Sequence, residues 1–141
     1  MSVEQNKALV CHAIEEVYNK GNIAVIDERF SPDYIHHSLP PGMPHDTEGY
    51  KQMVKMLHTA FPDYRITIED VVAEGNNVVL RFHWSGTHKG EFMRIAPTGK
   101  KVTVTAMSMH RIQDGKEVEQ WGELDRVGMM QQLGVVPPPE Q

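Results

Sequence analysis

The sequence predicts an α+β fold in which helices cover one face of an antiparallel sheet. Up to Phe61 the apolar residues recur at helical spacing, whereas from Tyr64 onwards they alternate in segments rich in β-branched and aromatic residues. The change falls at Pro62, so helices and strands are segregated along the chain, as in α+β domains. A strongly curved sheet covered in this way encloses a pocket.

The helical part of the chain is expected to hold three helices. Ser2 and Gln5 fit a capping box at the start of the first helix, and Gly21 follows its end. Asn22 is suited to cap a short second helix, and Pro62 closes the third. The predicted helices span residues 2–20, 22–30 and 47–61, with a proline-rich irregular loop at 38–46.

The second half of the chain is expected to hold four strands and a short final helix. Asp114-Gly115 is a strong signal for a two-residue hairpin, because both turn positions favour a left-handed backbone. Gly75-Asn76 fits a second tight turn, and Gly134 ends the final helix. The predicted strands span residues 64–74, 78–88, 101–113 and 116–125, and the helix spans residues 127–133.

Length and composition indicate one ordinary globular domain. A chain of 141 residues can bury an adequate core without disulfides or metals. We expect a single domain at residues 1–134, followed by an extended, proline-rich tail at 135–141. The one cysteine, Cys11, lies on the predicted first helix without a nearby base, so we interpret it as a packing residue.

Charge and hydropathy exclude some classes of partner. The net charge of -5 gives no electrostatic reason to bind nucleic acid or anionic membranes. There is no apolar run of bilayer length, and the N-terminal stretch is polar and amphipathic rather than a signal peptide. We therefore expect a cytoplasmic protein with neither a nucleic-acid nor a membrane partner.

The 8 histidines do not have the spacing of a metal site. His36 and His37 are adjacent and point apart in an extended chain, and no pair matches the helical spacing of zinc hydrolases. No metal is expected. His88 lies between Gly86 and Gly90, where it could cap a loop or line the mouth of a pocket. Three other histidines are interpreted as polar surface or half-buried residues: His12, His45 and His58.

The C-terminal hairpin carries the main candidate site. Trp121, Glu123 and Asp125 alternate, so in a regular strand all three point to one face. A two-residue turn at Asp114-Gly115 pairs His110 with Glu119, which adds His110 to that face. In the same register, small residues lie opposite the large ones: Ser108 opposite Trp121, Ala106 opposite Glu123, and Val104 opposite Asp125.

This face has two interpretations. It can be a pocket wall, in which a desolvated carboxylate acts as a general acid or base and the imidazole of His110 supplies the second proton. It can also be the solvated face of the sheet, with the core on the other side. An exposed Trp121 is unfavourable, and Val102, Val104 and Ile112 continue the face as apolar, which favours the pocket. Met107 and Met109 would then suit a subunit interface, so a homodimer is expected.

Several segments, taken in order, resemble the SnoaL-like polyketide cyclase (ester cyclase) family. This family belongs to the superfamily of nuclear transport factor two and ketosteroid isomerase. The resemblance covers most of the chain and rests on these segments: Ala60-Phe61-Pro62-Asp63, residues 86–90, Pro97-Thr98-Gly99, residues 111–116, residues 121–125 and Gln132-Leu133-Gly134. The loop Met93-Arg94-Ile95-Ala96 departs from the pattern, where relatives have a glycine and an additional proline.

The resemblance implies a fold and a reaction. The fold is a cone of helices over a curved sheet, commonly dimeric. The reaction is a cofactor-free intramolecular aldol cyclisation of a polyketide ester, in which a pocket carboxylate removes a proton next to a carbonyl. A small carbonyl-bearing apolar molecule is the implied substrate, and no cofactor is expected.

The resemblance also suggests roles for individual residues. Asp125 matches the strand acid by its place after Trp121, with Glu123 as the alternative, and His110 resembles the second catalytic residue of the pocket. His37 resembles a pocket histidine after the second helix, although it could equally be a structural hydrogen-bonding residue. The predicted catalytic residues are Asp125 and His110, and the predicted substrate-binding residues are His37, Glu123, Trp121, His88 and Tyr18.

Two functions remain open from the sequence. The first is an acid/base enzyme with Asp125 as base and His110 as partner. The second is a non-catalytic module that binds a small molecule or a protein through the same fold. The second predicts pocket acids that are paired with Arg or Lys, or that lie too far from any open volume to touch a ligand.

Overall fold

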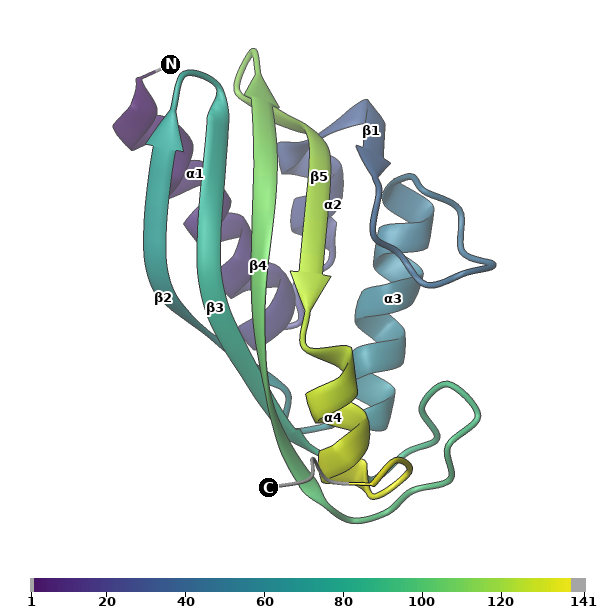
Figure 1. The fold of residues 1–141 in the computed structure, drawn as a ribbon. Helices are drawn as coiled ribbons and strands as arrows, with labels where there is room; N and C mark the ends of the chain where they lie inside the picture. Colours follow the sequence, from purple (N-terminus) through teal and green to yellow (C-terminus); the bar gives the residue numbers. More distant parts are fainter. Residues whose placement is uncertain (1, 138–141) are drawn as a thin grey trace.

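One curved sheet organises the molecule, which a computed structural model describes over residues 2–137 (Figure 1). The strand order is β1-β5-β4-β3-β2. Neighbours among β2 to β5 are antiparallel, whereas β1 runs parallel to β5. The strands are β1 Phe30–His36, β2 Arg65–Glu74, β3 Asn77–Thr87, β4 Lys101–Gln113 and β5 Lys116–Leu124.

The N-terminal helices lie on one face of this sheet, and the last helix lies at the end of the sheet where β5 finishes (Figure 1). The α+β prediction, with helices over the concave face, is confirmed. The helical elements are α1 Val3–Ile14, the single wide turn η1 Glu15–Asn19, α2 Ala24–Arg29, α3 Thr47–Ala60 and α4 Arg126–Leu133. Their apolar faces pack with the inner face of the sheet into one core.

The ends of the elements follow from local chemistry. Ser2 and Gln5 form the predicted capping box, and Asp46 caps α3 by accepting the backbone N–H of Gly49 at 3.0 Å. Gly134 ends α4 with a φ of 81°. The predicted β4–β5 turn is also confirmed, since Asp114 and Gly115 both have positive φ, at 52° and 75°.

Strand β1 is the main error of the sequence-based prediction. The sequence placed its residues in the second helix and the loop after it, and therefore predicted a fully antiparallel sheet. The structure instead pairs Ile35 with Glu119 and His36 with Gln120, which makes the sheet mixed. Pro32 is tolerated because β1 is an edge strand, where a missing N–H breaks no ladder.

The register of the β4–β5 hairpin differs from the prediction beyond its first two pairs. Gln113 pairs with Lys116 and Ile112 with Glu117 as expected, but Arg111 pairs with Glu119 rather than with Val118. The intervening residue, Val118, is therefore a β-bulge. One extra residue reverses the face of every later side chain, so the predicted pairing of His110 with Glu119 is wrong and His110 lies opposite Gln120.

The wide turn η1 connects the helices to the sheet. Its last residue, Asn19, accepts the backbone N–H of Ile66 at 2.8 Å and donates its amide to the Ile66 carbonyl at 3.0 Å. This two-way clamp to β2 holds the preceding residue, Tyr18, in a buried position over the sheet. Wide turns of this kind are frequent at functional sites.

The C-terminal tail is described only in part. Residues 135–137 follow α4, and residues 138–141 of the predicted proline-rich tail lie outside the described residues. None of the helices between residues 2 and 137 is long and apolar enough to cross a membrane.

Candidate functional site

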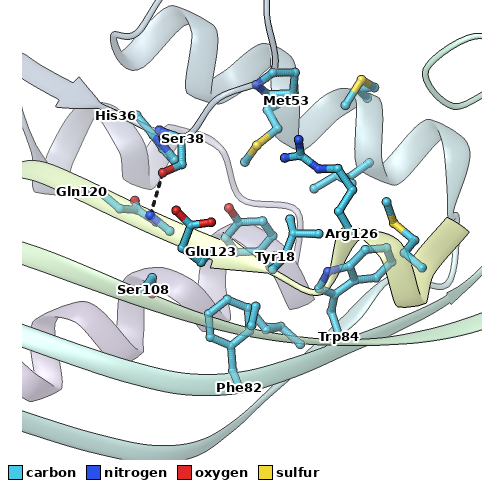
Figure 2. A pocket seen from close by; sticks show the side chains of 18 of the residues that line it. Tyr18, His36, Ser38, Met53, Phe82, Trp84, Ser108, Gln120, Glu123 and Arg126 are labelled. Carbon is cyan, nitrogen blue, oxygen red and sulfur yellow. Dashed lines mark hydrogen bonds between the residues drawn. The ribbon is translucent and has the colours of Figure 1, made fainter. Parts of the chain in front are cut away.

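A mostly apolar cavity lies between the concave face of the sheet and the helices (Figure 2). Its volume is about 150 Å³, similar to that of a cavity that holds one small aromatic ring. The apolar wall includes Tyr18 of η1, Met53 and Leu57 of α3, Phe82 and Trp84 of β3, and Met129 of α4. The loop that departs from the family pattern contributes Met93.

One end of the cavity is polar, and His36 is a defined hydrogen-bond donor there. Its Nδ1 accepts the backbone N–H of Ser38 at 3.1 Å, so the neutral ring carries its proton on Nε2. Burial, with a further contribution from His110, lowers the pKa of His36 to about 3. The ring is therefore neutral near pH 7 and lines the cavity as a donor.

Gln120 and Tyr18 add two more neutral donors to the cavity wall. The Tyr34 hydroxyl donates to Oε1 of Gln120 at 2.6 Å, which orients the amide and leaves its NH₂ group for other partners. Burial raises the pKa of Tyr18 to about 12, so its hydroxyl keeps its proton near pH 7. Gln120 and Tyr18 both line the cavity together with His36.

Glu123 brings the one carboxylate among the described lining residues, and Arg126 brings a guanidinium (Figure 2). Both residues are exposed, so they lie at the open part of the cavity. Within residues 2–137, Glu123 takes part in no ion pair, whereas Glu117 and Glu119 both do. Glu123 pairs with Met107 across the hairpin, on the face that also carries Trp121, so its unpaired carboxylate borders the cavity at the open rim while the neutral donors line the inside.

Asp125 lies at a different place from the one that the sequence suggested. It is the N-cap of α4, where its Oδ1 accepts the backbone N–H of Gly128 at 2.9 Å. The residue is exposed, and it is not among the described residues that line the cavity. Its backbone N–H is bonded to the Thr105 carbonyl at 3.0 Å. The structure therefore gives Asp125 a helix-capping position.

His110 is buried behind the cavity wall. Its Nε2 lies 2.8 Å from the Ser108 hydroxyl, and its Nδ1 lies 2.6 Å from Oε1 of Glu117. Ser108 lines the cavity, whereas His110 and Glu117 do not. His110 therefore reaches the cavity only through Ser108. Ala106 and Ser108 are on the cavity side as predicted, but Ser108 lies opposite Gly122 rather than Trp121.

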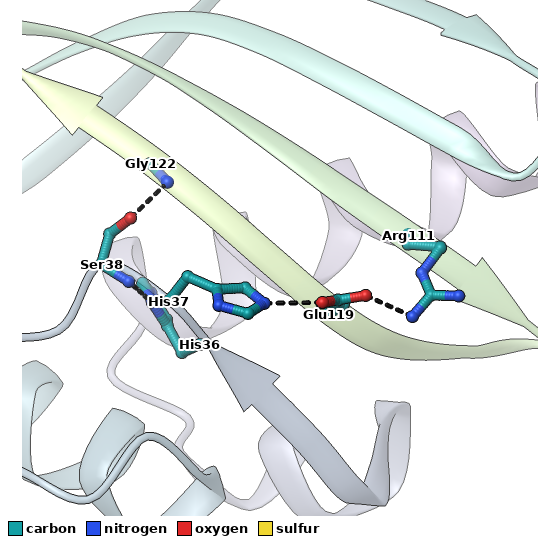
Figure 3. Close-up of polar contacts among 6 residues, drawn as sticks. All are labelled: His36, His37, Ser38, Arg111, Glu119 and Gly122. Carbon is teal, nitrogen blue, oxygen red and sulfur yellow. Dashed lines mark hydrogen bonds and ion pairs between the residues drawn. The ribbon is translucent and has the colours of Figure 1, made fainter.

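Trp121 and His37 lie together, away from the cavity lining. Their rings stack with centroids 4.8 Å apart. Nε2 of His37 is 2.6 Å from Oε2 of Glu119, whose other oxygen accepts a hydrogen bond from Arg111 (Figure 3). The histidine bond, then the arginine bond, lowers the pKa of Glu119. The prediction that Trp121 and Glu123 share a face with His110 is wrong, because the bulge at Val118 reverses both side chains: Trp121 pairs with Met109 and Glu123 with Met107.

His88, predicted to cap a loop or line the mouth of a pocket, has the first of these roles. His88 is buried, and its Nδ1 accepts the backbone N–H of Thr98 at 3.2 Å, so it ties the loop of residues 89–100 to the end of β3. It does not belong to the described lining of the cavity. A cross-strand ion pair joins β2 and β3, with Nε of Arg81 2.6 Å from Oδ2 of Asp70.

The sequence-based prediction missed His36, Gln120 and Ser38 as cavity residues. The adjacent His36 and His37 were expected to point apart, but only the pairing of β1 with β5 decides which of them faces inward. Gln120 was overlooked because the unbulged register placed it on the opposite face from the candidate acids. A bulge leaves no clear sequence signal, so neither error could be corrected from the sequence alone.

These features define a class of protein. A curved sheet with helices on its concave face, enclosing a largely apolar cavity with a polar end, is the cone-shaped fold of the superfamily that includes nuclear transport factor two. A family model for the SnoaL-like polyketide cyclases matches residues 8–133. The chain belongs to the SnoaL-like polyketide cyclase family.

Solved structures agree with this assignment. IdmH from Streptomyces antibioticus, described as a candidate polyketide cyclase, is 34% identical with a TM-score of 0.80, and the match covers 92% of this chain and 99% of that one. A candidate polyketide cyclase from Acidithiobacillus ferrooxidans is 31% identical (TM-score 0.80; coverage 96% and 99%). AclR from Streptomyces galilaeus, described as a candidate hydroxylase, is 28% identical (TM-score 0.87; coverage 99% and 87%). Among curated proteins, none matches the chain significantly.

Proposed function

We propose that the protein is a cofactor-independent acid/base enzyme that cyclises a small, carbonyl-bearing, largely apolar substrate by an intramolecular aldol reaction. The observation that carries the proposal is the unpaired carboxylate of Glu123 at the rim of a cavity whose lining includes three neutral hydrogen-bond donors. Membership of a family of polyketide cyclases supports the reaction class. Two similar solved structures are described as candidate cyclases, which adds to this support.

The proposed chemistry begins with proton removal at Glu123. The carboxylate takes a proton from the carbon next to a substrate carbonyl, and the negative charge moves to the carbonyl oxygen. The donors of Tyr18, His36 and Gln120 stabilise this oxyanion. These donors are neutral and already oriented. Their hydrogen bonds to the oxyanion therefore strengthen as charge develops, without a large reorganisation cost. The enolate then attacks a second carbonyl of the same molecule and closes a ring.

Glu123 replaces Asp125 as the proposed base, and His110 has an indirect role. Glu123 was the alternative left open by the sequence, and it lines the cavity, whereas Asp125 caps α4. His110 contacts the cavity through Ser108 and not with its own ring. We therefore assign oxyanion stabilisation to His36 and its neighbours. Tyr18 keeps its predicted role as a substrate-binding residue.

Proton abstraction can be measured without knowing the natural substrate. Acetophenone has one aromatic ring and a methyl group next to its carbonyl, which suits a cavity of about 150 Å³. We expect the protein to accelerate exchange of these methyl protons in D₂O, followed by ¹H NMR. Glu123→Gln should reduce the rate at least about 100-fold, because general-base catalysis is worth roughly 10²–10⁴.

Asp125→Asn is the matched control for this experiment. It also removes one carboxylate, two residues away, but asparagine caps helices about as well as aspartate. Exchange in this variant should stay within about twofold of the wild type, because the change leaves the cavity intact. Exchange that survives in Glu123→Gln and is lost in Asp125→Asn would return the base to Asp125.

A non-catalytic binding module is the alternative on the same fold. It predicts acids that are paired with Arg or Lys, or that lie too far from open volume to touch a ligand. Glu119, bonded to Arg111, and Glu117, buried behind the cavity wall, fit that description. Glu123 does not fit it, which is why we favour the enzyme. The alternative would hold if acetophenone and related aryl ketones bind without any exchange above the buffer rate.

A homodimer stays a prediction. Met107, at 52% exposure, lies in the middle of β4, where it faces Glu123 of β5 across the hairpin. An exposed methionine on a central strand suits a subunit interface. Sedimentation of the full chain would show a dimer, and Met107→Glu should shift it toward the monomer.

A further inference from the structure

Three polar side chains form an unbroken chain of hydrogen bonds from the core to the cavity wall. Oγ of Ser108 lies 2.8 Å from Nε2 of His110. Nδ1 of His110 lies 2.6 Å from Oε1 of Glu117. Ser108 and His110 are two residues apart on β4 and point to the same face, while Glu117 comes from β5. The order is hydroxyl, imidazole and carboxylate.

The chemistry of these groups sets the direction of the hydrogen bonds. An ionised carboxylate only accepts, so Nδ1 of His110 carries a proton and donates to Glu117. In the neutral ring Nε2 is then an acceptor, and the Ser108 hydroxyl donates to it. A serine that donates to an imidazole held by a carboxylate is the arrangement that activates a serine nucleophile.

Ser108 is nearly buried, but no bulky side chain stands opposite it on the cavity side. Ser108 lines the cavity, and its partner across the hairpin is Gly122, which has no side chain. A methyl group built on Gly122 would make ordinary van der Waals contacts with the Met107 carbonyl oxygen at 3.8 Å, Cβ of Ser38 at 3.9 Å and Cβ of Ser108 at 4.0 Å, so one methyl fits there without a clash. The amide of Gln120 borders the same cavity and can donate to an oxyanion.

The stability of the fold does not explain this chain of buried polar groups. The side chains of His110 and Glu117 are each 1% exposed. Oε2 of Glu117 is buried and has no hydrogen-bond partner among residues 2–137. A buried ion pair is commonly no better for stability than well-packed apolar residues, and an unsatisfied carboxylate oxygen adds a cost. Such an arrangement is more usual where chemistry requires it.

From this geometry we infer that Ser108 is an acylatable nucleophile, and that the protein hydrolyses small apolar esters at this serine. Oγ of Ser108 attacks the ester carbonyl carbon while its proton passes to Nε2 of His110. The imidazolium returns that proton to the departing alkoxide, which leaves an acyl ester on Ser108. Water then attacks the acyl carbon, gives a proton to His110, and releases the carboxylic acid as Ser108 regains its proton. Glu117 holds the ring and acts as a positioning residue.

The experiment is acetylation by p-nitrophenyl acetate, read by peptide mass spectrometry and by release of p-nitrophenolate. We expect one acetyl group on the peptide that contains Ser108. Ser38 is an internal control in the same digest, because it borders the cavity but has no histidine on its hydroxyl. Ser108→Ala should remove the adduct and the burst of p-nitrophenolate.

Two further variants separate activation from simple accessibility. Glu117→Gln keeps the size of the side chain and a hydrogen-bond acceptor but removes the charge, and it should slow acetylation by at least about tenfold. Gly122→Ala adds a methyl group in front of Ser108 and should slow acetylation while circular dichroism stays unchanged. Phenylmethylsulfonyl fluoride, a second probe for activated serines, should block the reaction by labelling Ser108.

Other outcomes would overturn the inference. These are acetylation confined to lysines, equal labelling of Ser38 and Ser108, labelling that Glu117→Gln leaves unchanged, or no serine adduct with either probe. The result does not depend on the proposed cyclase reaction, because acylation is scored as mass on Ser108 and proton exchange is scored on acetophenone.

Discussion

The two faces of the β4–β5 hairpin each hold a glutamate bonded to a histidine, in opposite surroundings. On the inner face, Glu117 and His110 are 2.6 Å apart and each side chain is 1% exposed. On the outer face, Glu119 and His37 are also 2.6 Å apart, with 16% and 36% exposure (Figure 3). The two contacts have the same length, so the pairs differ in how far their side chains are exposed to solvent. The inner pair lies behind the cavity wall, in contact with Ser108 of the lining, whereas the outer pair joins the end of β1 to β5.

The largest expected difference between the pairs is in stability. Glu117→Ala leaves the His110 ring buried without its partner, so the free energy of unfolding should fall by about 3 kcal/mol or more. Urea denaturation followed by circular dichroism measures the change. A loss below about 1 kcal/mol would mean that the inner pair contributes no more to the free energy of unfolding than a surface pair does.

The pH dependence of stability should separate the two faces next. The pKa of His36 is lowered to about 3, mainly by burial. Below about pH 6.5 the His36 ring therefore binds a proton in the unfolded chain but not in the folded chain. The free energy of unfolding falls as the pH drops. The slope between about pH 6.5 and 4.5 should include up to about 1.4 kcal/mol per pH unit from this residue.

His36→Gln is the variant that tests this slope, because it removes the titrating ring and keeps a polar side chain. Its free energy of unfolding should depend less on pH in that window. Glu119 contributes in a lower range, because its pKa is depressed and its stabilisation is lost only as the pH falls below about 4.5. A slope that His36→Gln leaves unchanged would contradict the neutral, buried ring.

The smallest expected effect is on the outer face. Glu119→Ala breaks contacts with His37 and Arg111, but these groups can turn to solvent. The free energy of unfolding should fall by about 1 kcal/mol or less, and the loss should shrink further in high salt. A loss as large as that of Glu117→Ala would remove the contrast between the two faces.

The contrast also shows what could be predicted from the sequence. The helices, the Asp114-Gly115 turn and the apolar inner positions of β4 follow from periodicity and turn chemistry. The bulge at Val118 does not, because either register satisfies the local rules. That one residue moved Glu119 and Trp121 to the outer face and brought Gln120 to the inner one.

The position of β1 was the other feature that could not be predicted from the sequence. Pro32 and the charged Asp33 argue against a strand, and only pairing with the edge of β5 makes one. The candidate site depends on that pairing, because it turns His36 inward and His37 outward. The sequence supplied both histidines and the strand acids, and the tertiary pairing selected among them.

Ligand binding can be assigned to one face with the two tryptophans of the chain. Trp84 lines the cavity, whereas Trp121 stacks on His37 away from it. Protein labelled with 5-fluorotryptophan should give two ¹⁹F resonances, assigned with Trp84→Phe and Trp121→Phe. On titration with acetophenone, the Trp84 resonance should shift to saturation while the Trp121 resonance stays in place. A shift of Trp121 with an unchanged Trp84 would contradict the inner cavity as the functional site.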